Sequence, residues 1–342
     1  MESRLPEVQT GLYPKHHLWG IDALEKQDNF HIEWIKINNS RFHPLVERIL
    51  NRSIFRGSLG VNIERSIIRA SHNSDLIYSV CGPPGVAKYL NNKVISWVFR
   101  PFEKSVRSIF NSYSHSNLSA NKAFFCLTPN AEKYYSQYAK SKFIPWCVDL
   151  DLFDGKLNTH NQDAPFFLAT GKTGRDYATL VNAASFVNAE IRIIGPSKQK
   201  PAKLPSNVNW IDTTSDPPDQ AIDYPTLRDW YSQSIGVCIP LSGDAEDTCG
   251  YTNMLEAMAM RKPVLMTKSG CLHISPETDS FGLEIMPGDA QGWAHAMIHL
   301  LKDSERALGM GNRGRVIVEK DFTIERFNED VLELIQASLN NI

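Results

Sequence analysis

Residues 250–267 have the residue types and spacing of a ligand-binding site. They read as a loop, then a helix that begins near Thr252, and then a strand from Pro263. A helix N-terminus presents unpaired backbone N–H groups and the positive end of the helix dipole, which together attract a phosphate. Glu256, about one turn further on, can accept hydrogen bonds from two neighbouring hydroxyls such as those of a ribose. A solvated glutamate on an amphipathic helix would give the same pattern.

Three other segments match known binding motifs, but their sequence context argues against those functions. Residues 309–314 (GMGNRG) satisfy GxGxxG, but a helical pattern precedes them where a dinucleotide fingerprint needs a strand, so a glycine-rich helix end is favoured. Residues 171–173 (GKT) match the end of a GxxxxGK[ST] loop, but Phe166 stands where its first glycine belongs. Asp149 and Asp151 are alternate residues, which point to opposite sides of an extended chain, so a metal site is the minor interpretation.

Alternating elements must position these residues. Short β-type runs alternate with helical stretches, which is typical of parallel sheets covered by helices. The expected strands are residues 7–12, 31–37, 75–80, 94–99, 123–127, 166–170, 190–194, 208–211, 236–240 and 263–267. The polar segment 154–164 lacks periodicity and indicates a linker. We therefore expect an α/β protein with two doubly wound, Rossmann-like domains over residues 1–153 and 154–322. Residues 323–342 form a final amphipathic helix, for which packing back on the first domain is one option.

Composition and charge narrow the classes of function. The chain has 342 residues with 42% hydrophobic and 22% charged residues, an ordinary globular composition. The first 150 residues carry 19 Lys and Arg against 12 Asp and Glu, whereas the rest carry 17 against 26. The basic excess is densest over residues 36–69, which predicts contact with anionic lipid or a phosphorylated substrate, or else a solvated helix face. The apolar residues among these arginines could equally pack on the first sheet.

Other observations exclude partners and compartments. There is no overall basic balance and no nucleic-acid motif, so nucleic acid is not an expected partner. The six cysteines contain no CxxC pair, which is typical of reduced, buried thiols rather than a zinc site. The start of the chain lacks the apolar core of a signal peptide, so we expect a cytoplasmic protein.

Four segments resemble the retaining nucleotide-sugar glycosyltransferases of the two-Rossmann-domain (GT-B) type, particularly family 4, the glycosyl transferases group 1. Residues 143–153 (FIPWCVDLDLF) resemble the family's run at the domain junction, and residues 167–180 (FLATGKTGRDYATL) its first donor-domain strand and phosphate loop. Residues 227–240 resemble the helix and strand that lead to the site, and residues 253–259 (NMLEAMA) the family's LLEAMA helix. The resemblance implies an acceptor domain and a donor domain that face each other across a cleft.

The resemblance also implies roles for residues in the donor half. Arg175 aligns with the lysine of the family's phosphate loop and becomes the main catalytic residue, because a guanidinium binds a diphosphate in fork geometry. Lys172 is close enough to assist, and Glu256 binds the ribose. Thr248 stands where the family has its first glutamate, eight residues before Glu256. The other predicted donor-binding residues are Gly171, Thr173, Gly174, Gly250, Tyr251, Thr252 and Asn253.

In the first half, residues 13–20 occupy the place of the family's glycine-rich turn against the diphosphate. His16, His17, Trp19 and Gly20 are therefore predicted on the acceptor or phosphate side of the cleft, although adjacent histidines can also be a solvent-exposed pair. Arg100 is the polar candidate at the end of the strand 94–99, where many family members carry a histidine.

The implied reaction moves a sugar from a nucleoside-diphosphate sugar, of UDP or GDP type, to an acceptor hydroxyl. The resemblance implies retention, no cofactor and no metal ion, because cations and a helix N-terminus can stabilise the leaving diphosphate. The acceptor would be a sugar, a lipid-linked or a small molecule. Two alternatives stay open: a nucleotide-sugar epimerase or hydrolytic relative, and a GT-B binding protein whose donor site has decayed.

Overall fold

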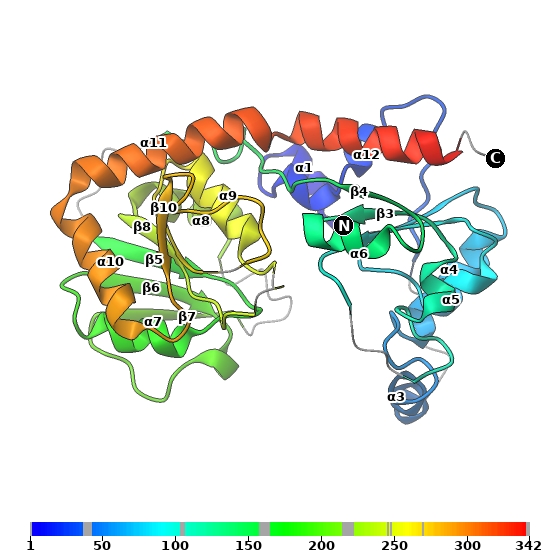
Figure 1. Ribbon diagram of the computed structural model, residues 1–342, viewed down its shortest axis with the longest axis horizontal. Helices are drawn as coiled ribbons and strands as arrows, with labels where there is room; N and C mark the ends of the chain where they lie inside the picture. Colours follow the sequence, from blue (N-terminus) through cyan, green and yellow to red (C-terminus); the bar gives the residue numbers. More distant parts are fainter. Residues whose placement is uncertain are drawn as a thin grey trace. The chain divides into compact units, whose positions relative to one another are not determined.

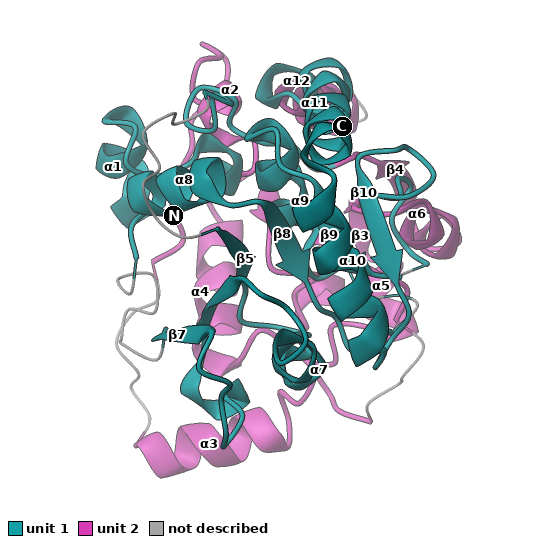
Figure 2. Cartoon of the chain, turned by 90° about the vertical axis from the view of Figure 1, so that its left-hand side faces the viewer, with its two compact units in different colours: residues 1–18, 146–326 teal, residues 19–145, 327–342 magenta. Residues whose placement is uncertain are grey.

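The computed structural model describes residues 2–36, 43–102, 107–156, 165–213, 222–244, 246, 248–268 and 270–339, which form two α/β units (Figures 1 and 2). Unit 1 comprises residues 1–18 and 146–326, and unit 2 comprises residues 19–145 and 327–342. The sequence analysis placed boundaries after residues 153 and 322. The structure instead groups the first 18 residues, together with residues 146–153, with the second half of the chain.

Unit 1 is built on a parallel six-stranded sheet in the order β10-β9-β8-β5-β6-β7. Its strands are β5 (Phe166–Thr170), β6 (Glu190–Gly195), β7 (Val208–Asp212), β8 (Gly236–Ile239), β9 (Val264–Thr267) and β10 (Gly282–Ile285). The central strands β5, β8 and β9 are buried along most of their length, which explains their unbroken apolar runs in the sequence.

Helices cover both faces of this sheet. Helices α7 (Tyr177–Ala184) and α10 (Ala290–Lys302) share one hydrophobic core with the sheet, and α8 (Tyr224–Gln233) and α9 (Tyr251–Ala259) lie on the other side (Figure 1). Helix α11 (Ser304–Asp321) packs along α9. The remaining short elements of unit 1 are η1 (Glu2–Arg4), α1 (Leu5–Gln9), η2 (Lys15–Leu18) and η4 (Ser197–Gln199).

Unit 2 contains a parallel four-stranded sheet in the order β1-β2-β3-β4. Its strands are β1 (Ile77–Ser79), β2 (Val94–Val98), β3 (Asn121–Cys126) and β4 (Lys140–Phe143). Its helices are α2 (Ile21–Leu24), α3 (Pro44–Arg52), α4 (Val61–Ser71), η3 (Ala87–Tyr89), α5 (His115–Leu118), α6 (Pro129–Tyr135) and most of α12 (Ile324–Leu339). Phe327 of α12 stacks on Trp97 of β2 with ring centroids 5.5 Å apart.

Most of the expected strands are confirmed, and two are wrong. Residues 7–12 begin inside the short helix α1 and continue as a turn, because Pro6 at its first turn and Gly11 at φ +72° favour a helix that ends early. Residues 31–36 are irregular, and residue 37 lies outside the described residues. Strands β4 and β10 were not expected. Most of the predicted linker, residues 157–164, also lies outside the described part of the chain.

The glycines of residues 309–314 lie inside helix α11, so the expectation of a glycine-rich helix end is wrong. A Cβ on Gly311 would lie 2.0 Å from the carbonyl oxygen of Arg261, and one on Gly314 would lie 3.1 Å from Met258 Cγ. These glycines therefore let α11 approach the end of α9 closely, which is a packing role and not phosphate binding.

All six cysteines are thiols rather than halves of disulfides, and four of them are buried: Cys126, Cys147, Cys238 and Cys271. Within the described residues, no helix is both long enough and apolar enough to cross a bilayer.

Candidate functional site

The strand order of unit 1 reverses between β5 and β8, which is the point where open α/β sheets form a ligand-binding crevice. The chain leaves β5 toward β6 on one side and leaves β8 toward β9 on the other, so the connections that follow these two neighbours diverge. In open α/β sheets, ligands bind at such a reversal, beyond the carboxyl ends of the strands. The loop after β5 and the segment from β8 to α9 are the two connections that diverge here. They contain most of the donor-binding residues predicted from the sequence.

Arg175 organises the loop after β5. Its Nε donates to the carbonyl of Thr170 at 3.2 Å, one terminal nitrogen donates to the carbonyl of Thr173 at 3.0 Å, and the other donates to Asn253 Oδ1 at 2.6 Å. Gly171 has a φ of +140°, and a Cβ there would lie 2.4 Å from the Arg175 guanidinium. The loop is therefore wrapped around this cation, while Lys172 and Thr173 are exposed.

Gly250 begins helix α9 at the edge of the same crevice. It is the N-cap residue at φ +87°, and no side chain caps the helix. A Cβ on Gly250 would lie 2.5 Å from Ile239 Cγ2, so only glycine fits. The contact between Arg175 and Asn253 joins the loop after β5 to the first turn of α9. A guanidinium and an uncapped helix N-terminus are thus brought to one place, and both favour an anion.

The remaining predicted residues of this region differ in exposure. Thr248, Thr252 and Gly174 are partly exposed, whereas Tyr251 is buried. Burial raises the pKa of Tyr251 well above its usual range, so its hydroxyl stays protonated. The side chain of Tyr251 therefore packs in the core under α9. Only its backbone is left to make the predicted contact with the nucleotide-sugar donor.

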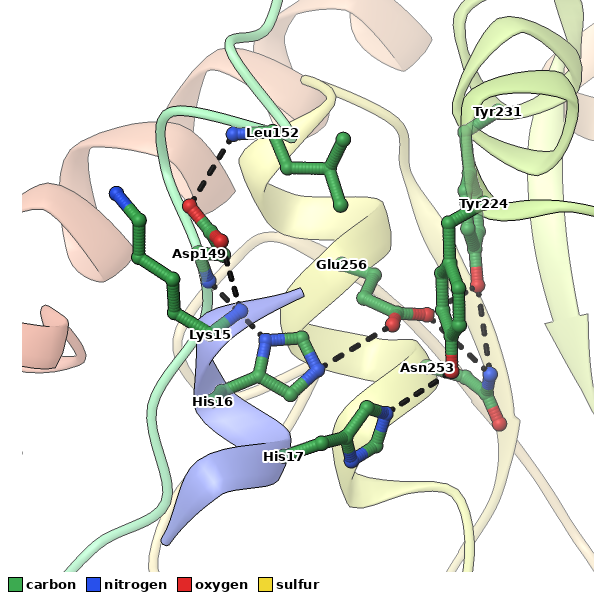
Figure 3. Close-up of polar contacts among 9 residues, drawn as sticks. All are labelled: Lys15, His16, His17, Asp149, Leu152, Tyr224, Tyr231, Asn253 and Glu256. Atoms are coloured by element: carbon green, nitrogen blue, oxygen red, sulfur yellow. Dashed lines mark hydrogen bonds and ion pairs between the residues drawn. The ribbon is translucent and has the colours of Figure 1, made fainter. Parts of the chain in front are cut away.

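Glu256 lies deeper than the sequence analysis expected. Its side chain is buried, with 1% of the residue exposed, so the predicted partly solvated position is wrong. Oε2 accepts the hydroxyl of Tyr231 at 2.9 Å, and Asn253 Nδ2 lies 3.5 Å from the same oxygen (Figure 3). Burial raises the pKa of Glu256 to about 7, although the hydrogen bonds from Tyr231 and Asn253 oppose this. The carboxylate is thus held by α8 and by its own helix.

His16 and His17 belong to unit 1 and lie beside α9 (Figure 3). His16 is buried, and its Nε2 is 3.7 Å from Glu256 Oε1. The pKa of His16 is well below its usual value, mainly because of burial and also because of His17, so the pair is not an ion pair. His17 is partly exposed and its Nε2 is 2.9 Å from the hydroxyl of Tyr224 at the start of α8. The two histidines are therefore not a solvent-exposed pair.

Asp149 fixes the segment that carries these histidines. Its Oδ2 accepts the backbone N–H of Lys15 at 2.9 Å, and its Oδ1 accepts those of Asp151 and Leu152 at 3.2 Å each. The carboxylate of Asp151 is exposed and pairs with the Lys15 ammonium. Asp149 therefore acts as a backbone anchor. No group of three or more His, Cys, Asp or Glu side chains suited to a metal occurs among the residues that the structure describes.

Trp19, Gly20 and Arg100 belong to unit 2. Trp19 packs edge-on against Trp97, with ring centroids 5.1 Å apart, and has a φ of +56°. Gly20 begins α2 at φ +80°, where a Cβ would lie 3.0 Å from Val331 of α12. Arg100 is exposed just beyond β2. Trp19 and Gly20 have packing roles within unit 2, and the predicted acceptor-side roles of all three stay predictions.

The sequence analysis did not single out Tyr231 or Tyr224. Both lie on α8, and Tyr231 is fully buried with its hydroxyl on Glu256. A tyrosine in a helical apolar stripe is usually a core residue, so the pattern gave no signal for a polar contact. Tyr231 differs from an ordinary core tyrosine because its hydroxyl donates to a buried carboxylate, which only the structure shows.

The sequence profile of the family described as Glycosyl transferases group 1 matches residues 155–303. This region contains both loops of the crevice. The matched region, a little under half of the chain, is therefore similar to the glycosyl transferases of group 1. A search by sequence finds no match among curated proteins.

Solved structures show the same fold along most of the chain. A glycosyltransferase from Rickettsia africae ESF-5 is 18% identical, with a TM-score of 0.62 over 94% of this chain and 88% of that one. A sucrose-phosphate synthase from Thermosynechococcus elongatus is 16% identical, with a TM-score of 0.63 over 92% and 88%. HepE from Anabaena in complex with UDP-glucose is 13% identical, with a TM-score of 0.57 over 81% and 82%. At these identities the likeness establishes the GT-B fold.

Proposed function

We propose that the protein transfers a sugar from a nucleoside-diphosphate sugar to an acceptor hydroxyl, with retention of configuration and without a metal ion. The observation that carries the proposal is the contact of 2.6 Å between Arg175 and Asn253, which joins the loop after β5 to the N-terminal turn of α9. It gathers positive charge at the reversal point of the sheet. A diphosphate is the ligand that best suits this combination.

In this reaction the bond between the anomeric carbon and the β-phosphate oxygen breaks, and a bond to the acceptor oxygen forms. The acceptor's proton passes to the leaving phosphate, so no protein base is required. Arg175 stabilises the negative charge that develops on the diphosphate, and the N–H groups at the start of α9 act on the same group. Lys172 is exposed at the tip of the loop and can assist. Glu256 binds the ribose.

We favour UDP over GDP as the donor nucleotide, because HepE, which shares the fold, is described in complex with UDP and with UDP-glucose. Calorimetric titration of the full chain with UDP, GDP and ADP, each with and without EDTA, tests the nucleotide and the metal requirement together. We expect UDP to bind with equal affinity in both buffers. Binding of none of the three would reject the donor site and favour a protein whose donor site has decayed.

Incubation of the protein with UDP-glucose, with and without an acceptor, followed by product analysis, separates the enzymatic alternatives. A transferase releases UDP only when an acceptor is present, whereas an epimerase converts the donor sugar and releases no nucleotide. A hydrolytic relative releases UDP without an acceptor. Retention is read directly from the anomeric configuration of the product by NMR, and an inverted product would reject that part of the proposal.

We also propose that unit 2 docks on an anionic membrane through helix α3. Asn51 of α3 faces the unit, because its Oδ1 accepts the backbone N–H of Val61 at 2.8 Å. At about 100° per residue, Ile49 lies about 160° around the helix from Asn51. Ile49 and Leu45 are accordingly exposed, at 57% and 58%. The apolar side of α3 thus points away from unit 2, and does not pack on the sheet.

Charge complementarity identifies the partner of this surface. Arg48 and Arg52 are exposed on α3, and Arg56 follows shortly after it. Among the described residues, no acidic side chain pairs with these three. The one acid of the helix, Glu47, is half-buried. Exposed apolar residues beside unpaired arginines favour the surface of an anionic bilayer, which supports a lipid-linked acceptor.

Sedimentation with vesicles tests the docking. We expect the full chain to bind vesicles that contain acidic phospholipid at low salt, and the Arg48→Gln/Arg52→Gln variant to bind about thirtyfold more weakly, since each of the two arginines contributes about 1 kcal/mol. The variant Lys200→Gln/Lys203→Gln removes two exposed charges from unit 1 and should bind like the parent. Equal binding by all three proteins, or by none, would reject the membrane surface.

A further inference from the structure

The two ring nitrogens of His16 have different surroundings (Figure 3). The backbone N–H of Asp149 donates to Nδ1 at 3.2 Å, so Nδ1 carries a lone pair and no proton. Burial lowers the pKa of His16 well below its usual value, so the ring is neutral and its single proton is on Nε2. This nitrogen is buried and has no hydrogen-bond partner. The nearest carboxylate oxygen is Glu256 Oε1 at 3.7 Å.

This unsatisfied N–H lies beside the buried carboxylate of Glu256, whose ionised form a hydrogen-bond donor stabilises. Buried donors are nearly always paired, so an exception calls for a role. An approach of about 0.8 Å would bring Nε2 to an ordinary hydrogen-bond distance from Oε1. Both partners are held from other sides, His16 by Asp149 and Glu256 by Tyr231. A small shift of η2 or of the first turns of α9 is therefore sufficient to form the bond.

The other groups around Glu256 do not neutralise its charge directly. Tyr231 of α8 is a neutral donor whose pKa burial raises well above its usual range, and Asn253 of α9 is also neutral. Arg175 reaches the carboxylate only through Asn253. On η2, His17 binds the hydroxyl of Tyr224. The two donors to Glu256, Tyr231 and Asn253, are therefore both neutral. The Nε2–H of His16 is a third neutral donor close to this carboxylate.

We propose that His16 is a positioning residue for Glu256: in the free protein as well as with a nucleotide bound, Nε2–H closes on Oε1 and donates to it, which holds the carboxylate ionised and oriented toward the ribose. The ribose part rests on the proposed function, whereas the contact between the two side chains does not. The segment 13–17 thereby becomes part of the donor site, although it lies far from α9 in the sequence.

Two isosteric substitutions separate the two nitrogens of His16. The amide oxygen of His16→Asn replaces Nδ1 and can still accept the Asp149 N–H, but it leaves no donor for Glu256. The amide nitrogen of His16→Gln replaces Nε2 and keeps that donor. His16→Leu provides a second variant without a donor, should the asparagine variant fold poorly. His17→Asn is the matched control on the neighbouring residue, which does not face Glu256.

The first measurement is the titration of Glu256 in the free protein by carboxyl ¹³C NMR, with its signal assigned by its loss in Glu256→Gln. Removing a donor to the ionised form raises the pKa of a carboxyl. We expect the midpoint to rise by about one pH unit in His16→Asn and His16→Leu. It should stay at the parent's value in His16→Gln and His17→Asn. An unchanged midpoint in both donor-free variants would overturn the proposal.

The second measurement is the affinity for UDP at neutral pH. We expect His16→Asn to bind about tenfold more weakly and His16→Gln within about threefold of the parent, since a hydrogen bond to a charged group is at stake. A shifted Glu256 titration with unchanged UDP affinity would confirm the contact and reject the ribose role of Glu256. A parent protein that binds no nucleotide would reject the proposed function, and the titration would still decide the role of His16.

Discussion

The buried carboxylate of Glu256 makes the stability of the protein depend on pH. Burial raises its pKa from 4.5 to about 7, so between these values the folded protein holds a proton that the unfolded chain releases. Stability falls with rising pH wherever the folded state binds more protons. The contribution of Glu256 is therefore fully present below about pH 4.5 and is lost as the pH rises through about 7. A difference of about 2.5 pH units corresponds to about 3 kcal/mol.

Glu256→Gln should abolish this dependence. The amide cannot ionise, and its oxygen can still accept the hydroxyl of Tyr231. Between about pH 4.5 and about pH 8, the free energy of unfolding of the parent should therefore fall by about 3 kcal/mol relative to that of the variant. The informative quantity is the change of the unfolding free energy with pH, and not its value at one pH. Any difference in how the amide packs shifts the variant's unfolding free energy equally at all pH values.

Urea unfolding of the full chain, followed by circular dichroism across this pH range, measures the effect. Glu277→Gln, an exposed site of the same unit, controls for the loss of one negative charge. Parallel profiles for the parent and Glu256→Gln would refute the raised pKa and the burial argument behind it. The same variant should bind UDP about 10-fold to 150-fold more weakly, as expected for the loss of a charge-assisted hydrogen bond.

Three further predictions concern the crevice. Arg175→Lys should lower kcat by about 100-fold and change KM much less, because it keeps the charge but loses the fork that acts on the leaving group; equal effects on kcat and binding would contradict this. Turnover should survive EDTA, and activity lost on chelation and restored by Mn²⁺ or Mg²⁺ would reject metal independence. Gly250→Ala should destabilise the protein by about 1 to 3 kcal/mol in thermal unfolding, because its Cβ would lie 2.5 Å from Ile239 at a φ of +87°. An unchanged melting temperature would show that α9 begins differently.

The donor half of the chain was predictable because its signals are local. The buried parallel strands β5, β8 and β9 appear as unbroken apolar runs, and a turn and a helical pattern follow most of the strands. The segment that contains Gly250 and Glu256 matched a family pattern in which glycine and glutamate have fixed places. These features need only neighbouring residues, so the sequence by itself determined the α/β class, the positions along the chain of the strands from β5 to β9 and the resemblance to the family.

The first 18 residues were not predictable in the same way. Residues 7–12 have the composition of a strand, but Pro6 and Gly11 confine the segment to a short helix and a turn. Nothing local indicates that His16 packs against Glu256, because the contact joins residues 240 positions apart. Long-range pairing of this kind is decided by the fit of whole surfaces.

The tertiary structure alone decided the state of the polar groups. A glutamate one turn into a helix reads as solvated, yet packing against α8 and η2 buries Glu256 and raises its pKa. Conversely, the apolar residues of α3 read as core residues, yet Asn51 takes the inward side and leaves Ile49 exposed. Residue type fixes what a side chain can do, whereas its burial and its partners, set by distant parts of the chain, decide which of these it does.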